Sequence, residues 1–148
     1  MLPREIATGA ELRGSEYGWR VTAFPSAVIA AKRLGYACLG GQFQFRSSSS
    51  IHEMYWLCAD SSPRRDAEPW SDYAVRSCEE TMQRFQHLLG TTDWMREAEG
   101  WPGLAEELPS ASKPADALVF VAYFVTEIEA GRLTESARAS AALKSNDE

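Results

Sequence analysis

His52 and Glu53 begin the spacing of a zinc-protease signature, in which two histidines on one helix face bind zinc and the glutamate acts as a general base. The second histidine is missing, because Trp56 occupies its position. A single histidine cannot hold zinc, and the surrounding residues are typical of a strand rather than a helix. With only two histidines in the chain, His52 and His87, we expect no metal site and interpret His52 as a loop residue beside a strand.

The serines, cysteines and glycines offer no complete catalytic or phosphate-binding motif. Ser47–Ser50 supply consecutive hydroxyls, but no strand-to-helix nucleophile elbow surrounds them. Cys58 ends a predicted strand, and no sequence signal places an activating base beside it. Gly40–Gly41 are not followed by the lysine and hydroxyl residue of a phosphate loop. The sequence therefore predicts no catalytic residue and no cofactor.

The most polar stretch between two predicted elements runs from residue 60 to residue 68. Functional residues concentrate on loops that rigid elements hold, and an arginine there can grip a carboxylate or a phosphate. Alternatively, these charges pair with one another on a hydrated surface. Together with Glu53, the loop defines one alternative function, a small enzyme or ligand-binding protein with a pocket near residues 53–68. Its candidate residues are Asp60, Arg64, Arg65, Asp66 and Glu68.

The charge balance indicates which macromolecules are suitable partners. The chain has 21 acidic and 15 basic residues, and its net charge is −6. Such a surface repels nucleic acid phosphates, and it accelerates association with basic proteins. Acidic residues gather near two tryptophans in the irregular segment 94–107, and tryptophan is favoured at binding hot spots. The predicted partner-binding residues are Trp94, Glu97, Glu99, Trp101, Glu106 and Glu107.

We therefore expect a small, acidic, non-catalytic module that binds another, basic protein and neither nucleic acid nor membrane. One concrete form is a bacterial immunity protein that neutralises a basic toxin such as a nuclease. For Trp94 and Trp101, packing against the core is the alternative role. A further alternative function is a homodimeric structural or regulatory protein, joined through the apolar segment 117–125 or an unpaired sheet edge.

The cysteines and the apolar runs indicate a compartment. Cys38, Cys58 and Cys78 are an odd number without a disulfide pattern, and we interpret them as small core residues of a reduced, cytoplasmic protein. The longest apolar run, Ala117–Val125, is shorter than the roughly 20 residues that cross a bilayer. The first residues include Glu5 and no apolar stretch typical of a secretory signal.

Two segments predict an antiparallel hairpin. In residues 42–46 apolar and polar side chains alternate, which places Phe43 and Phe45 on one face of a strand. Residues 53–59 form a second run, rich in aromatic residues, that is apolar on both faces and should be covered on both sides. Because two strands alone are marginally stable, we expect at least one further strand, from residues 19–22 or from the N-terminus.

Three main helices are predicted, at about 26–34, 70–89 and 115–130. Apolar residues recur at helical spacing in 70–89, with Phe85 on the apolar stripe, Pro69 in the first turn and Gly90 at the C′ position. The polar face of this helix predicts ion pairs of Asp72 with Arg76 and of Glu80 with Arg84.

The segment 115–130 is apolar nearly all round in its first half, which we interpret as a buried helix. Residues 135–143 are expected to form a final small helix. Strands followed by helices predict one α+β domain over residues 1–148, with a small antiparallel sheet and a C-terminal tail that frays from about residue 144.

Overall fold

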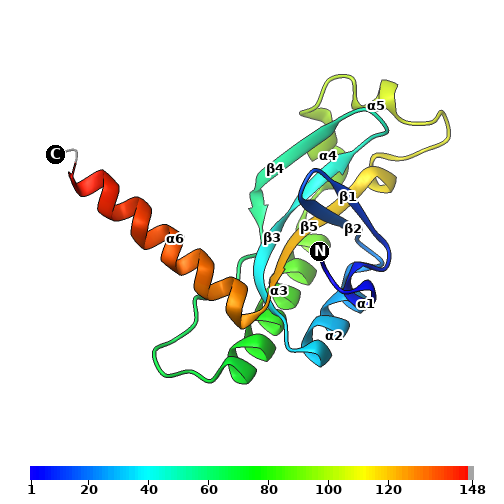
Figure 1. The fold of residues 1–148 in the computed structure, drawn as a ribbon. Helices are drawn as coiled ribbons and strands as arrows, with labels where there is room; N and C mark the ends of the chain where they lie inside the picture. The colour runs from blue at the N-terminus through cyan, green and yellow to red at the C-terminus, as the bar shows by residue number, and fades with distance from the viewer. Residues whose placement is uncertain (147–148) are drawn as a thin grey trace.

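The computed structural model describes residues 1–146, which form one antiparallel sheet and a set of helices (Figure 1). The strands are β1 (Ala10–Arg13), β2 (Glu16–Arg20), β3 (Ala37–Arg46), β4 (Ile51–Cys58) and β5 (Leu118–Val125). The helices are α1 (Arg4–Ala7), α2 (Phe24–Leu34), α3 (Trp70–Thr91), α4 (Trp94–Glu99), α5 (Leu104–Glu107), the 3-10 helix η1 (Pro114–Ala117) and α6 (Glu127–Asn146).

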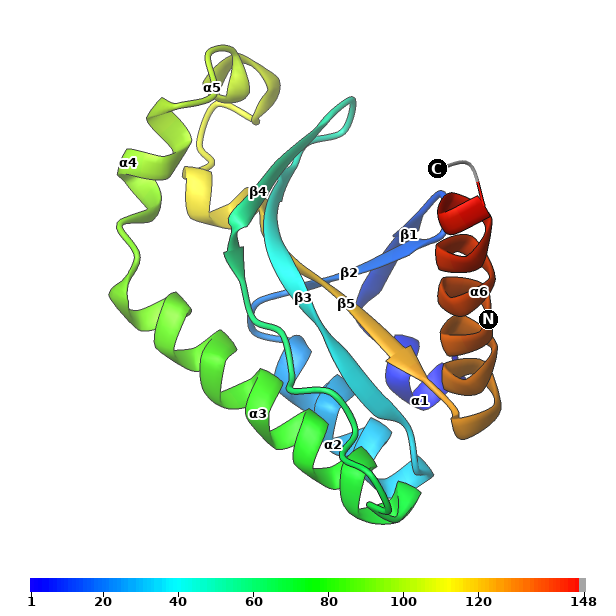
Figure 2. The same ribbon diagram turned by 90° about the vertical axis from the view of Figure 1, so that its left-hand side faces the viewer.

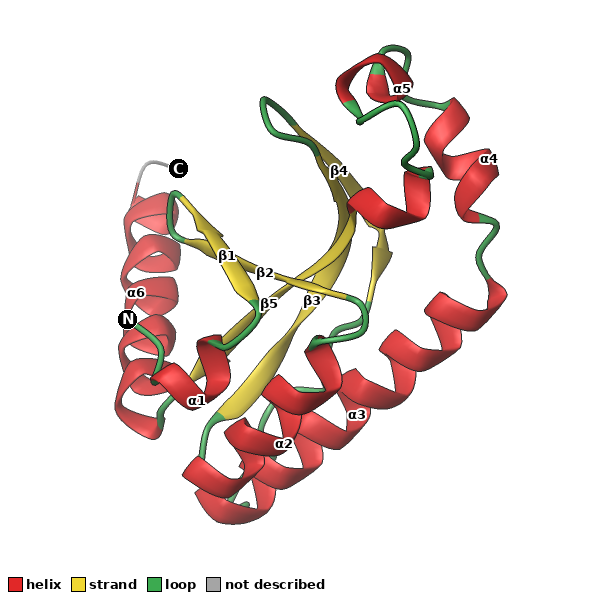
Figure 3. Cartoon of the chain, turned by 90° about the vertical axis from the view of Figure 1, so that its right-hand side faces the viewer, coloured by secondary structure: helices red, strands yellow, loops and turns green. Residues whose placement is uncertain are grey.

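The five strands lie in the order β1-β2-β5-β3-β4, and α2 and α3 cover one face of the sheet (Figures 2 and 3). This architecture confirms the predicted α+β fold. Strands β1 and β2 supply the further strand that was expected from residues 19–22 or the N-terminus, and β2 ends at Arg20. Among the described helices, none combines the length and the apolar character that a bilayer span requires.

Helix α3 and the hairpin β3–β4 form as the residue patterns predict. Phe85 of α3 is 1% exposed and lies among Phe24, Phe43 and Phe120, with ring centroids 4.8, 5.4 and 5.0 Å away. The predicted end of the helix is wrong, because α3 continues through Gly90 to Thr91. The backbone of Gly90 does not have a positive φ angle, so the glycine continues the helix rather than capping it.

The predicted helix at 115–130 is wrong. Residues 118–125 form β5, which pairs with β2 on one side and β3 on the other. A run that is apolar on every face suits a central strand as well as a buried helix, and its valine and phenylalanine content favours the strand. Because β5 lies in the centre of the sheet, this segment is not available as a dimer surface. The homodimer alternative then depends on an unpaired edge of the sheet.

The second strand of the hairpin, β4, lies at the edge of the sheet and is not covered on both sides, contrary to expectation. Tyr55 is 71% exposed and Trp56 is 50% exposed, and Cys58 is exposed as well, so neither Trp56 nor Cys58 is a core residue. His52 lies within β4 rather than in the connecting loop. As an edge strand, β4 has a neighbouring strand on one side only, so its side chains have fewer strands beside them to pack against.

Two arginines, Arg13 and Arg46, connect β1 and β2 to β3 and the β3–β4 loop at the other end of the sheet. Arg46 is 7% exposed and passes β2 to reach β1, where its Nη1 donates a hydrogen bond of 2.7 Å to the Glu11 carbonyl. Gly18 makes room for it, because a Cβ there would lie 2.7 Å from the Arg46 guanidinium carbon. Arg13 of β1 donates to the carbonyls of Ser47 and Ser50, so β1 is fastened to the β3–β4 loop.

Helix α6 leaves the sheet and projects from the rest of the molecule (Figure 1). Every side chain from Gly131 to Ser145 is exposed. The predicted small helix 135–143 lies inside α6, which begins earlier, at Glu127. Of the tail that was expected to fray, residues 144–146 belong to α6, and residues 147–148 lie outside the described part of the chain.

Candidate functional site

A surface with exposed aromatic rings forms where β4 meets the segment that contains α4 and α5. Trp56 of β4 stacks on Trp101, with ring centroids 6.3 Å apart and an interplanar angle of 11°. Tyr55 lies beside Trp56 at 5.1 Å, and the indole Nε1 of Trp56 donates a hydrogen bond of 3.2 Å to the Glu97 carboxylate. We call Tyr55, Trp56, Glu97 and Trp101 the aromatic–acidic surface.

The structure brings together only part of the predicted partner-binding set. Glu97 and Trp101 meet at the aromatic–acidic surface, and Glu99 and Glu106 are exposed on the same segment. Trp94 packs inward instead, since its ring lies 4.8 Å from Phe43 and its Nε1 donates to the Leu89 carbonyl. It therefore takes the packing role that was the alternative for it.

Glu107 also turns inward and is not free to meet a partner. Its Oε2 accepts a hydrogen bond of 2.7 Å from Ser47 Oγ, accepts another from Ser50 Oγ, and lies 3.2 Å from His52 Nε2. The hydrogen bonds from Ser50, Ser47 and His52 hold the pKa of the Glu107 carboxyl at about 2. This cluster fastens the end of α5 onto the β3–β4 hairpin.

The serine, histidine and glutamate of this cluster do not have the geometry of a catalytic triad. In a triad the histidine contacts the nucleophile through one ring nitrogen and the orienting carboxylate through the other. Here Ser50 Oγ, at 2.9 Å, and Glu107, at 3.2 Å, both approach Nε2 of His52. The Glu107 carboxylate therefore does not orient the His52 ring to act as a base on Ser50. The hydrogen bonds of this cluster connect α5 to the β3–β4 hairpin.

The polar loop 60–68 is fixed by Arg76 of α3. Its Nε and Nη2 donate to the two oxygens of Glu68 at 2.8 and 2.7 Å, and Nη1 donates to Glu80 at 2.7 Å. Arg76 thus pairs with Glu68 and Glu80 instead of the predicted Asp72. The hydrogen bonds from Arg76 are the main reason that the pKa of the Glu68 carboxyl is lowered to about 2.

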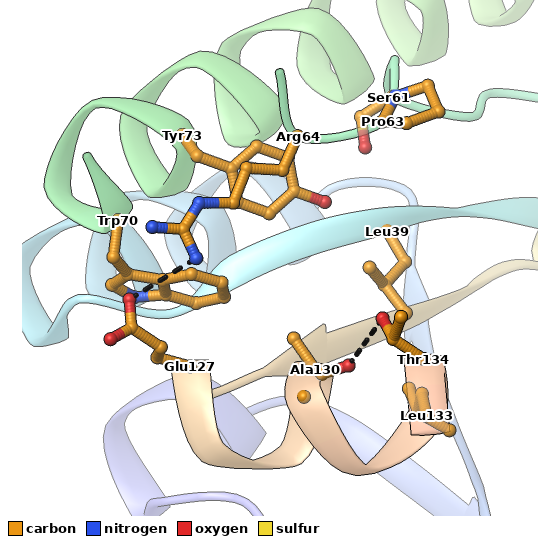
Figure 4. Close-up of a pocket in the computed structure, with 11 residues that line it drawn as sticks. Leu39, Ser61, Pro63, Arg64, Trp70, Tyr73, Glu127, Ala130, Leu133 and Thr134 are labelled. Carbon is orange, nitrogen blue, oxygen red and sulfur yellow. Dashed lines mark hydrogen bonds and ion pairs between the residues drawn. The ribbon is translucent and has the colours of Figure 1, made fainter. Parts of the chain in front are cut away.

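The other candidate residues of the loop have different surroundings. Arg64 lies over the Trp70 ring, as Figure 4 shows, whereas Asp60, Arg65 and Asp66 are exposed. Glu53 is not part of this group, because it lies on β4 and accepts a hydrogen bond of 3.3 Å from Gln44. The predicted pocket near residues 53–68 is therefore represented by Arg64 and its neighbours, without Glu53.

The cysteines are free, and two of them are buried as predicted. Burial raises the pKa of Cys38 to about 11 and that of Cys78 to about 12, so both remain neutral thiols. Within residues 1–146, no group of three or more His, Cys, Asp or Glu side chains is placed to hold a metal ion.

No family model, curated protein or solved structure matches this chain. Two members of the aromatic–acidic surface, Tyr55 and Trp56, lie in the run 53–59 that was expected to be covered on both sides. The sequence pattern therefore did not indicate them as surface residues. The contact of Trp56 with Glu97 joins residues 41 positions apart, and no local pattern signals it.

Proposed function

We propose that this chain is a small, non-catalytic module that binds a basic protein through the aromatic–acidic surface. The observation that carries the proposal is the position of Trp56, which is 50% exposed on an edge strand yet fixed by Trp101 and Glu97. Large aromatic side chains are mostly buried, so a tryptophan that is half exposed and is also held in place by its neighbours is unusual. Tryptophan and tyrosine held rigid on a surface supply contact area at little cost in side-chain entropy.

The charge around these rings supports a basic partner. The segment 93–107 carries five carboxylates and one arginine. Glu99 and Glu106 are exposed there and are available to attract cationic groups. Charges at the rim of an interface act mainly on the association rate, and the aromatic centre acts mainly on the dissociation rate.

A bacterial immunity protein is the specific form that we propose. A toxin that acts on nucleic acid needs a basic surface to bind phosphates, and such a surface is complementary to the exposed carboxylates of Glu99 and Glu106. The free thiols suit the reducing cytoplasm, where such a toxin has to be neutralised.

The test needs a candidate partner, which is sought among basic proteins encoded next to the gene for this chain. Each candidate is purified and mixed with this chain in a stopped-flow instrument. Trp56→Ala should speed dissociation and weaken binding by about 2 kcal/mol or more. Reversing Glu99 and Glu106 to Lys should slow association, and the wild-type rate should fall as salt rises.

Two control variants lie on other surfaces. Glu135→Lys reverses one exposed carboxylate on α6, and Ile29→Ala truncates a 66% exposed apolar side chain on α2. Both should bind as the wild type does. An association rate that does not depend on salt, together with unchanged binding by Trp56→Ala, would place the interface elsewhere.

A further inference from the structure

A cavity of about 650 Å³ lies where the loop 60–68 and the start of α3 face the first turns of α6 (Figure 4). Pockets for small organic ligands typically have volumes of about 300–1,000 Å³ and mostly apolar walls with a few polar groups. The apolar part of this wall consists of Leu39, Pro63, Trp70, Tyr73, Ala130 and Leu133. The cavity therefore has the size and the lining of a ligand site.

Arg64 is the single cation among the residues that line this cavity. Its Nε donates a hydrogen bond of 2.9 Å to the Glu68 carbonyl, and its guanidinium lies 5.4 Å from the centroid of the Trp70 ring. The Trp70 ring is itself held, because its Nε1 donates to the Gly35 carbonyl at 2.9 Å. These contacts hold the Arg64 guanidinium beside the Trp70 ring before any ligand binds.

The ion pair that Arg64 makes is weak enough for a ligand to replace it. Its Nη1 lies 3.4 Å from Glu127 Oε2, and the two side chains are 40% and 56% exposed. Exposed pairs of this kind contribute little free energy. A ligand carboxylate that pairs with Arg64 would take the place of Glu127, and the rest of the ligand would contact the wall of the cavity.

Arg76 of α3 holds the loop that carries Arg64 in place. Arg76 donates to the carbonyls of Ser62 and Pro63, next to Arg64, as well as to Glu68. Ala67 holds a φ of 61°, a conformation that residues other than glycine rarely adopt and that the surrounding contacts must maintain. A rigid loop reduces the entropy cost of binding, because the ligand does not have to order it.

The polar groups of the wall limit what the ligand can be. The hydroxyls of Ser61 and Thr134 already donate to the carbonyls of Cys38 and Ala130, at 2.6 and 3.1 Å. Burial raises the pKa of Tyr73, so its phenol stays neutral beside the cavity. Arg64 is thus the lining group that can pair with a negative charge, and apart from Glu127 the remaining wall offers mainly apolar contact.

We infer that this cavity binds a small organic carboxylate with a flat apolar body. The carboxylate pairs with Arg64, and the body lies against Trp70, Tyr73 and Leu39. The residues are separate from the aromatic–acidic surface, so this site and the proposed protein interface can succeed or fail independently. The carboxylate site is a specific version of the alternative function, a ligand-binding protein with a pocket near residues 53–68.

The test uses three probes with the same ring system: 2-naphthoate, neutral 2-naphthamide and cationic 2-naphthylmethylammonium. Binding is measured by calorimetry and by the NMR signal of the Trp70 indole N–H, assigned by its loss in Trp70→Phe. We expect 2-naphthoate to shift this signal and to bind about tenfold or more tightly than the amide, since the amide lacks the charged pair with Arg64.

The variants separate the role of Arg64 from the general charge of the loop. Arg64→Gln should weaken 2-naphthoate binding about tenfold or more, whereas Arg65→Gln, a change in an exposed neighbouring arginine, should leave it unchanged. Glu127→Gln should tighten binding, because it removes the competing carboxylate. Tighter binding of the ammonium probe, an unaffected Arg64→Gln, or an unshifted Trp70 signal at ~10 mM probe would each overturn the inference.

Discussion

Arg76 holds both carboxylate oxygens of Glu68, with its Nη2 2.7 Å from Oε1 and its Nε 2.8 Å from Oε2. This two-pronged pair joins the loop 60–68 to α3, and the same guanidinium donates to Glu80 one helical turn away. Paired geometry of this kind distinguishes it from ordinary surface ion pairs, which are worth little. The position of Arg64 at its cavity therefore depends on a residue that does not line that cavity.

The ion pair makes stability depend on acidity. Arg76 lowers the pKa of Glu68 from 4.5 to about 2, so its contribution is complete above pH 4.5 and is lost as the pH falls toward 2. Arg76→Gln should lower the stability at neutral pH and flatten the loss of stability between pH 4.5 and 2. Denaturant unfolding at a series of pH values measures both effects.

Glu107 provides the control for this prediction, because hydrogen bonds lower its pKa to about 2 as well and it has no contact with Arg76. Glu107→Gln should remove a separate part of the same pH dependence, and the two effects should add. An Arg76→Gln profile that falls as steeply as that of the wild type would show that Glu68 is not held by this pair.

The aromatic cluster around Phe85 should be a main source of stability. Phe85→Ala removes a ring that is 1% exposed and leaves a cavity among the rings of Phe24, Phe43 and Phe120, so we expect a cost of about 3–5 kcal/mol. Val75→Ala is the control on the same helix, since Val75 is 39% exposed and should change stability by less than about 0.5 kcal/mol. Urea unfolding of both variants measures the difference, and a Phe85→Ala cost below about 1 kcal/mol would contradict the packing.

Two glycines should respond to alanine in opposite directions. At Gly41 a Cβ would lie 2.0 Å from the Val121 carbonyl oxygen and 2.7 Å from the Phe120 ring, so Gly41→Ala has to push β3 and β5 apart. We expect a cost of about 3 kcal/mol or more. Gly90 lies in α3, and apart from its chain neighbours and the backbone of its own helix no atom lies within 4 Å of its Cβ position, so Gly90→Ala should stabilise the protein by about 0.5–1 kcal/mol.

Thermal unfolding of the two alanine variants tests the close approach of β3 and β5 and the corrected end of α3 together. A destabilising Gly90→Ala would mean that the residue caps the helix, as the sequence pattern had suggested. A neutral Gly41→Ala would mean that the two strands are farther apart than described.

Residue patterns predict an element correctly when the spacing of its apolar residues fits a helix but not a strand, or a strand but not a helix. The apolar stripe of α3 repeats at helical spacing and Pro69 marks its start, so its interior was predicted correctly. The run 118–125 has no polar residue to reveal a period, and its assignment to the sheet depends on pairing with residues of β2 and β3 that are distant in sequence.

The candidate sites were harder to predict for a related reason. Trp56 was expected in the core because aromatic residues are mostly buried, but the strand order, which no local pattern specifies, puts β4 at the edge. The hydrogen bond between Ser50 and Glu107 joins positions 57 apart, and that between Arg76 and Glu68 crosses from a loop to a helix. Such pairs are set by the packed fold.

Helix α6 is stabilised differently from the rest of the chain. From Gly131 to Ser145 its side chains are exposed, so its order depends on its own backbone hydrogen bonds and on its alanine content. An isolated helix of this length is close to the balance point between helix and coil in water. The chain thus contains two thermodynamic units, a cooperative sheet domain and a helix that unwinds gradually. Far-ultraviolet circular dichroism, which sums both, would report a sloping baseline before the domain itself unfolds.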